Sequence, residues 1–345
     1  MAAGRRLLAF APAWMWLFWL AGALVVAAGL TRGGEPEPRF LVTTGLTIEI
    51  WHGAERERTL LTYSDGSAIT HVAVSEDGSK LAFIRLVPVT QDERGVVDFG
   101  SDLYVGNIDG TDLHLVVKHA SLSEIIESPV WLTSGRQIAY SIVSPHPEAG
   151  TVDQGVETVD VLTGARKRLV AGAEWPALMA GGRELIFTST QARPETGQQT
   201  PLLYDLQDGS VKDLPGYQKK LIFINSYQPS PDGRLIAFAA AEPALEDLPV
   251  STPLRGQSAG FKTHPIFQDI WLMEPDGRNL RRIADLGLAT PSLAWSDDSE
   301  WVYVMSRQGF IRINAQNGAQ ETIGQGNSAG RIRLLANTAH TEVLR

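Results

Sequence analysis

The chain has 345 residues, of which 43% are hydrophobic and 20% charged, so it can bury one large core or two ordinary ones and is not globally disordered. Its formal net charge of −9 disfavours nucleic acid as a partner, because an acidic surface repels the phosphate backbone. The absence of cysteine excludes disulfides, thiolate metal sites and cysteine nucleophiles.

The N-terminus has the pattern of an export segment. Arg5 and Arg6 precede an uncharged run over residues 7–30, which as a helix would cross a bilayer core, since that takes about 20 residues. Basic residues on the short N-terminal side favour a cytoplasmic start and an extracytoplasmic remainder. We therefore predict a single-pass signal anchor over residues 1–32 and a stalk over residues 33–39. A cleavable signal peptide is the alternative, and both readings export the rest of the chain.

The remainder of the chain repeats a unit of two hairpins. The first hairpin has two apolar stretches around a tight polar turn, most clearly over residues 71–83 and 227–238. The second follows it, most clearly over residues 102–115 and 269–283. The Asp-Gly and Gly-Gly pairs at the turns readily adopt the positive φ angles that tight hairpins need. Each unit therefore predicts four antiparallel strands.

Five whole units recur at intervals of about 47 to 65 residues, the repeat length of propeller blades with insertions. Two pieces remain, a strand pair over residues 46–62 with its turn near Gly53 and a candidate strand over residues 331–336. Pairing them would close the ring and hide its strand edges. The sequence therefore predicts an all-β, six-bladed β-propeller of four-stranded antiparallel blades over residues 40–345, preceded by the transmembrane helix.

The repeat resembles that of the TolB-type propellers, whose repeat is WD-like. The resemblance is carried by Ser-Pro-Asp-Gly-Arg-Leu-Ile-Ala-Phe at residues 230–238 and Asp-Ile-Trp-Leu-Met-Glu-Pro-Asp-Gly at residues 269–277. The blades are also similar to those of prolyl oligopeptidase relatives. The resemblance extends over nearly all of residues 40–336, and it implies a β-propeller fold.

No residue pattern in the chain indicates catalysis or metal binding. Two Gly-x-Ser-x-Gly stretches centre on Ser258 and Ser328, but neither lies between a buried strand and a helix, as a nucleophile elbow requires. The seven histidines lack zinc-site spacing, and the Asp-rich turn over residues 107–112 lacks the later bidentate Glu of a calcium loop. We therefore predict no catalytic residue, no metal site and no cofactor.

Four connections between the second and third strands of a blade are predicted to be long: residues 87–101, 144–155, 190–201 and 242–268. Topology places all of them on one face of the disc, which we call the long-connection face. Long loops on a rigid scaffold often bind partners, and neutral drift in length is the alternative. The longest connection carries the residues that we predict to form a binding site: Leu245, Leu248, Leu254, Phe261, His264 and Phe267.

Together these features favour an extracytoplasmic binding or scaffold module that recognises a protein, peptide or cell-envelope polymer on the long-connection face. The alternative is a propeller enzyme of the glycosidase or lyase kind, with carboxylates in the central pocket. A ring of acidic side chains at the axial mouth would favour the enzyme. An apolar or mixed long-connection face would favour the binding module.

Overall fold

A computed structural model of the chain describes residues 37–91, 97–121, 124–146, 151–190, 199–242, 267–289, 291–326 and 331–335. The chain divides into two units, Met1–Glu37 and Pro38–Arg345. The predicted anchor and residues 33–36 of the predicted stalk lie outside the described residues. The described residues include no helix long and apolar enough to span a membrane.

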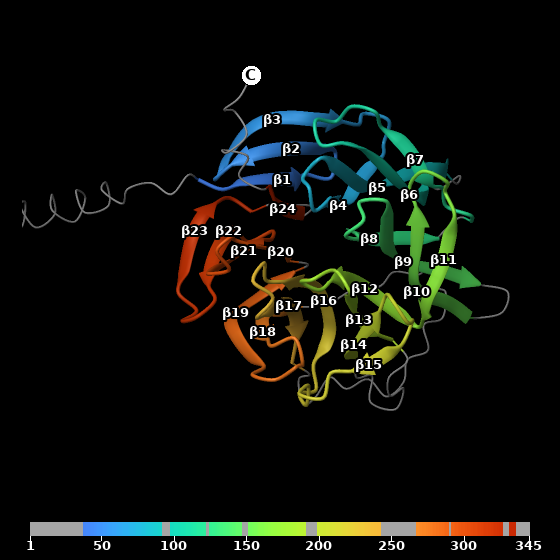
Figure 1. The fold of residues 1–345 in the computed structure, drawn as a ribbon. Coiled ribbons are helices and arrows are strands. Elements are labelled where there is room, and N and C mark those ends of the chain that lie inside the picture. The colour runs from blue at the N-terminus through green and yellow to red at the C-terminus, as the bar shows by residue number, and fades with distance from the viewer. Residues whose placement is uncertain are drawn as a thin grey trace, which may run out of the picture. The chain divides into compact units, whose positions relative to one another are not determined.

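Six four-stranded antiparallel sheets form a ring in the second unit, which confirms the predicted all-β, six-bladed propeller (Figure 1). The inner strands of neighbouring blades contact one another around the axis. Five blades consist of consecutive strands, which run in each blade from inner to outer: β4 (Ala68–Val74), β5 (Lys80–Gln91), β6 (Val97–Asn107) and β7 (His114–Val117); β8 (Ile125–Trp131), β9 (Gln137–His146), β10 (Thr151–Asp160) and β11 (Arg166–Ala171); β12 (Ala173–Leu178), β13 (Glu184–Ser189), β14 (Thr200–Asp205) and β15 (Val211–Asp213); β16 (Ile222–Pro229), β17 (Ile236–Ala241), β18 (Phe267–Met273) and β19 (Arg281–Ala289); β20 (Ser292–Trp295), β21 (Trp301–Met305), β22 (Phe310–Asn314) and β23 (Gln320–Gly324).

The sixth blade joins the two ends of the propeller. Its inner strand β24 (Arg331–Leu335) pairs with β1 (Arg39–Thr43), and β2 (Thr47–His52) and β3 (Glu55–Thr62) complete the sheet. Strand β1 was not predicted. The run Phe40, Leu41 and Val42 is fully buried on both faces of the sheet, so it lacks the apolar–polar alternation that marks a half-exposed strand.

The repeated Ser-x-Asp motif closes the turns between first and second strands by side-chain hydrogen bonds. Ser75 Oγ donates to Asp77 Oδ1 (2.6 Å) and accepts from the Lys80 amide (2.9 Å), and Asp77 Oδ1 also accepts from the Ser79 amide (3.0 Å). Hydrogen bonds from Ser75 and Ser79 lower the pKa of Asp77 to about 2. The arrangement explains why the motif recurs. The same bonds are made by Ser230 with Asp232 and Leu235, and by Ser296 with Asp298 and Trp301.

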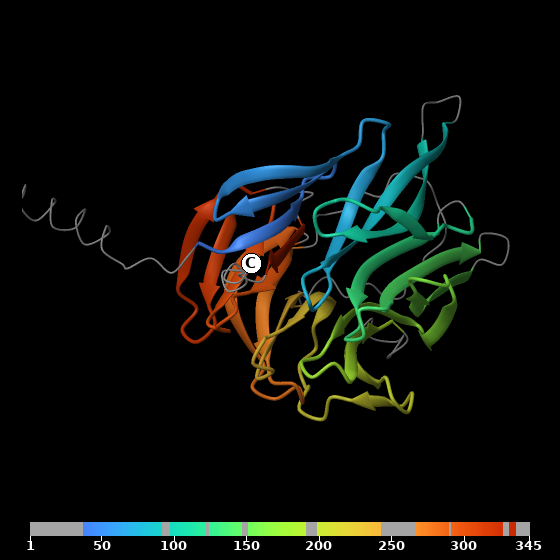
Figure 2. The ribbon, with the colours of Figure 1, turned by 45° about the horizontal axis from the view of Figure 1, so that its top comes forward.

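Two of the connections predicted to be long loops are extended hairpins instead. Strands β5 and β6 remain paired out to Gln91 and Val97, and β9 and β10 out to His146 and Thr151. Figure 2 shows β5 and β6 reaching beyond the strands beside them. Both extensions contain a proline, Pro88 in β5 and Pro145 in β9, and because proline cannot donate to a strand ladder the sequence pattern does not reveal the continued pairing. The other two connections include residues 191–198 and 243–266, which lie outside the described residues.

Candidate functional site

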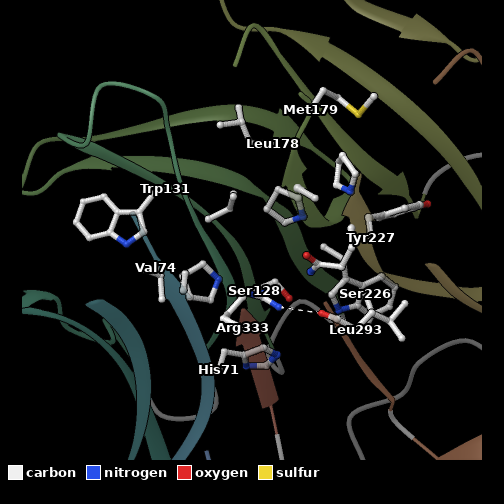
Figure 3. A pocket seen from close by; sticks show the side chains of 18 of the residues that line it. His71, Val74, Ser128, Trp131, Leu178, Met179, Ser226, Tyr227, Leu293 and Arg333 are labelled. Atoms are coloured by element: carbon white, nitrogen blue, oxygen red, sulfur yellow. Dashed lines mark hydrogen bonds between the residues drawn. The ribbon is translucent and has the colours of Figure 1, made fainter. Parts of the chain in front are cut away.

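A cavity of about 580 Å³ lies on the propeller axis, and residues of all six inner strands line it (Figure 3). Its volume is within the range of small-molecule sites, which is about 300–1,000 Å³. At one end it reaches the turns between first and second strands, where Thr133, Gly182 and Pro231 line it. This end is on the face opposite the long-connection face, and we call it the tight-turn face.

Three consecutive inner strands carry irregular backbone beside the cavity. Ser128 in β8, Trp175 in β12 and Ser226 in β16 have φ angles of 52°, 55° and 57°, and the pairing register of each strand shifts at the same place. Left-handed backbone is uncommon in residues other than glycine, and bulges of this kind redirect side chains. Neighbouring residues hold the irregular backbone. The Trp175 amide donates to Ser141 Oγ (2.7 Å), and Ser226 Oγ donates to the Pro291 carbonyl (3.0 Å).

Two arginines, Arg331 and Arg333, line the cavity from the closing strand β24. They are alternate residues of one strand, so their side chains leave the same face of the sheet. Burial lowers the pKa of both arginines, and that of Arg333 falls to about 10 because the Arg331 charge adds to the effect of burial. Both guanidinium groups therefore remain charged at neutral pH. Arg333 Nη1 donates to the carbonyls of Ile332 (3.1 Å) and Leu293 (3.5 Å).

Opposing groups reach the cavity from β4 and β8. Burial lowers the pKa of His71 well below its usual value, and the charges of Arg331 and Arg333 lower it further, so the imidazole is neutral at pH 7. Burial raises the pKa of Glu127, which the Arg331 charge and a side-chain hydrogen bond from Trp175 partly offset. The charged groups of the inner strands β8 and β24 in the described lining are therefore the two cations on β24 and the Glu127 carboxyl group on β8.

The described part of the lining carries few acidic side chains. Among the described residues that line the cavity, the carboxylates are Glu127 and Glu76, and Glu76 is exposed at a turn. His119 and Asp102, which lie outside the cavity lining, form a hydrogen bond of 2.7 Å that could suggest a catalytic dyad. Asp102 also accepts the His119 amide, and Asp269 at the corresponding place in another blade accepts the Leu286 amide. In both blades an aspartate of the third strand accepts a backbone amide within or just beyond the outer strand. The contact therefore holds the outer strand in the blade and does not indicate catalysis.

The long-connection face carries most of the exposed large apolar side chains among the described residues. Phe267 is 57% exposed and Phe223 is 39% exposed, and both begin strands at this face. Gln268 Nε2 donates to the Phe223 carbonyl (2.5 Å), which links these two strand starts. Seven of the ten exposed large apolar side chains lie at this end: Leu46, Val89, Phe99, Ile125, Val152, Phe223 and Phe267.

Of the residues predicted to form the binding site, the structure describes one. Phe267 is the first residue of β18, while Leu245, Leu248, Leu254, Phe261 and His264 lie outside the described residues. Arg331 and Arg333 were predicted only as part of a closing strand and not as residues of a site. The signal was present, because Arg-Ile-Arg in an inner strand must direct both cations to one face.

No protein-family model matches the sequence, and no curated protein matches it. Solved structures do match the fold. TolB from Acinetobacter baumannii is similar with a TM-score of 0.62 and 17% identity, over 91% of this chain and 72% of that one. The nidogen/laminin complex is similar with a TM-score of 0.58 and 10% identity, over 86% and 98%. A puromycin-hydrolysing peptidase from Mycobacterium tuberculosis is similar with a TM-score of 0.52 and 14% identity, over 86% and 44%. These likenesses establish the TolB-like β-propeller fold.

Proposed function

We propose that the chain is an extracytoplasmic, non-catalytic binding module whose protein partner docks on the long-connection face. The observation that carries this proposal is the pair of exposed rings of Phe223 and Phe267, whose strand starts are joined by the hydrogen bond from Gln268 to the Phe223 carbonyl, at the end of the propeller that carries most of the exposed large apolar side chains among the described residues. Soluble proteins rarely expose grouped apolar surface without a binding role, and aromatic side chains are enriched at protein interfaces.

Two further observations support a protein partner. One of the structures with the same fold is a complex between two proteins, nidogen and laminin. In the described part of the cavity lining the carboxyl groups are those of Glu127, on which the charge of Arg331 acts, and of Glu76, which is exposed at a turn.

The N-terminal run over residues 7–30 supports attachment of the module to a membrane, with the propeller on the extracytoplasmic side. Fractionation of cells that produce the full chain tests the attachment. We expect the chain in the membrane fraction, with the propeller accessible to protease from outside the cytoplasmic membrane.

The docking proposal predicts that substitutions on the long-connection face remove partner binding without unfolding the propeller. In the double variant Phe223→Ser/Phe267→Ser, two exposed rings are lost while the core is unchanged. The matched control is Leu162→Ser, because Leu162 is 78% exposed in the turn between β10 and β11, on the tight-turn face. Each tagged full-length chain is isolated from detergent-solubilised membranes of its own cells, and co-purified proteins are quantified by mass spectrometry.

We expect the double variant to retain its unfolding midpoint and to lose a specific co-purified protein by about tenfold or more, the ratio that corresponds to about 1.4 kcal/mol. Leu162→Ser should recover that protein as the wild type does. A Gly/Ser replacement of residues 244–263 tests the predicted residues Leu245, Leu248, Leu254 and Phe261 in the same assay. Equal recovery by the wild type and the double variant would remove the support for this face.

A further inference from the structure

One edge of the Arg333 guanidinium group is unused where it lines the axial cavity (Figure 3). Nη1 donates to the carbonyls of Ile332 (3.1 Å) and Leu293 (3.5 Å), and these two bonds use both N–H groups of that atom. Within the part of the chain that the structure describes, Nε and Nη2 have no hydrogen-bond partner. These two atoms form one edge of the planar group, so that edge is available to a ligand.

The charge of Arg333 also has no partner among the described residues. Glu127 and Glu76 are the carboxyl groups of the described lining, and neither acts on the pKa of Arg333. Burial lowers this pKa to about 10, and no carboxyl group in the described part of the chain offsets the effect. Taking a cation partly out of water without a partner is unfavourable. A ligand that brings a negative charge to Arg333 would remove this cost.

The geometry of the unused edge selects the chemical group that fits it. The two bonds from Nη1 hold the guanidinium group between β24 and β20, so the edge formed by Nε and Nη2 is oriented before any ligand binds. Two oxygens of a carboxylate or phosphate group accept parallel hydrogen bonds from such an edge. These charge-assisted bonds are about twice as strong as neutral ones. The edge therefore matches an oxyanion better than a neutral acceptor.

The rest of the lining limits what the oxyanion is attached to. The volume of about 580 Å³ is that of a small-molecule site. Val74, Leu178 and Met179 line the cavity near the tight-turn face. An apolar part of the ligand would displace water from these side chains, which is favourable. A small molecule with one oxyanion group and one apolar group therefore fits both parts of the lining.

We propose that the axial cavity binds a small molecule through an oxyanion group, carboxylate or phosphate, two oxygens of which accept hydrogen bonds from Nε and Nη2 of Arg333. This site is separate from the proposed docking face. Arg333 belongs to β24, the strand that closes the ring by pairing with β1. The ligand would therefore contact the closing strand, and its binding would stabilise the propeller, since a ligand that binds only the folded state stabilises it.

The test uses the purified full-length chain in mild detergent and three probes with the same apolar ring. Benzoate carries a carboxylate, phenyl phosphate carries a phosphate, and benzamide is uncharged. Calorimetric titration and thermal unfolding are measured with each probe. We expect saturable binding of at least one of the two oxyanions, with a rise in the unfolding midpoint, and the tighter of the two identifies the preferred group. Benzamide should bind at least about tenfold more weakly than that probe.

Substitutions of Arg333 separate its charge from its fork of donors. Arg333→Met removes both and should weaken binding of the preferred oxyanion by at least about tenfold. Arg333→Lys keeps the positive charge, but an ammonium group lacks the planar fork, so it should still weaken binding by about fivefold or more. Arg136→Met is the control, because Arg136 is an exposed arginine that pairs with Asp160 on the surface. It should bind the oxyanion as the wild type does.

Several outcomes would overturn the proposal. No saturable binding of either oxyanion to the wild type, or benzamide binding as tightly as both, would show that the cavity does not recognise an oxyanion. These comparisons need no variant, so they decide even if the Arg333 variants do not fold. Unchanged affinity in Arg333→Met would place the oxyanion elsewhere, and unchanged affinity in Arg333→Lys would exclude the fork. None of these results depends on the docking partner, so the two proposals fail independently.

Discussion

Glu174 gives the propeller a stability that depends on pH. The residue is buried at the start of β12, and burial together with the nearby charge of Glu127 raises its pKa from 4.5 to about 7. The folded state therefore holds the Glu174 proton more tightly than the unfolded chain does. This contribution is fully present below pH 4.5 and is lost as the pH rises through about 7. Because one pKa unit corresponds to about 1.4 kcal/mol, the loss is about 3 kcal/mol at most.

Glu174→Gln removes the titration and keeps the shape of the side chain. We expect the variant to match the wild type near pH 4.5 and to be more stable at pH 8, by up to about 3 kcal/mol. Urea unfolding of the full chain in mild detergent, followed by tryptophan fluorescence at both pH values, measures the difference. Glu55→Gln, at an exposed position in β3, is the control and should not alter the pH dependence. A Glu174→Gln variant no more stable than the wild type at pH 8 would refute the reasoning.

Two further variants test the ring closure and the repeated turn. Ile332→Ala should destabilise the propeller by about 2–5 kcal/mol, because fully buried Ile332 packs at the closing seam with Phe40 and Phe310. Urea unfolding measures this loss of stability, and a loss below about 1 kcal/mol would show that the closing seam tolerates a cavity. Ser230→Ala should cost about 1–3 kcal/mol, because it leaves the Leu235 amide without its partner. The pKa of Asp232, which the Ser230 hydroxyl lowers most, should also rise toward its ordinary value, and an NMR titration in which it stays low would contradict this role.

The differences between the predicted and observed strands have local physical causes. The hairpin turns at Asp77 and Asp232 were predictable, because a Ser-x-Asp-Gly turn is closed by groups within six residues. Strand β1 was not predictable, because it is buried on both faces and has no alternation. The extensions of β5 and β9 were missed, because backbone pairing there continues past Pro88 and Pro145, and proline normally marks the end of a strand.

The sequence by itself determined the number of blades, the order of their strands and the face that carries the connections between second and third strands. These properties follow from local turn chemistry and from the antiparallel order of consecutive hairpins. Only the tertiary structure decided that Arg331, Arg333, His71 and Glu127 share one cavity, because they come from β24, β4 and β8 and meet only when the ring closes. Their altered pKa values have the same origin, since burial and the field of a charge depend on neighbours in space and not on neighbours in the chain.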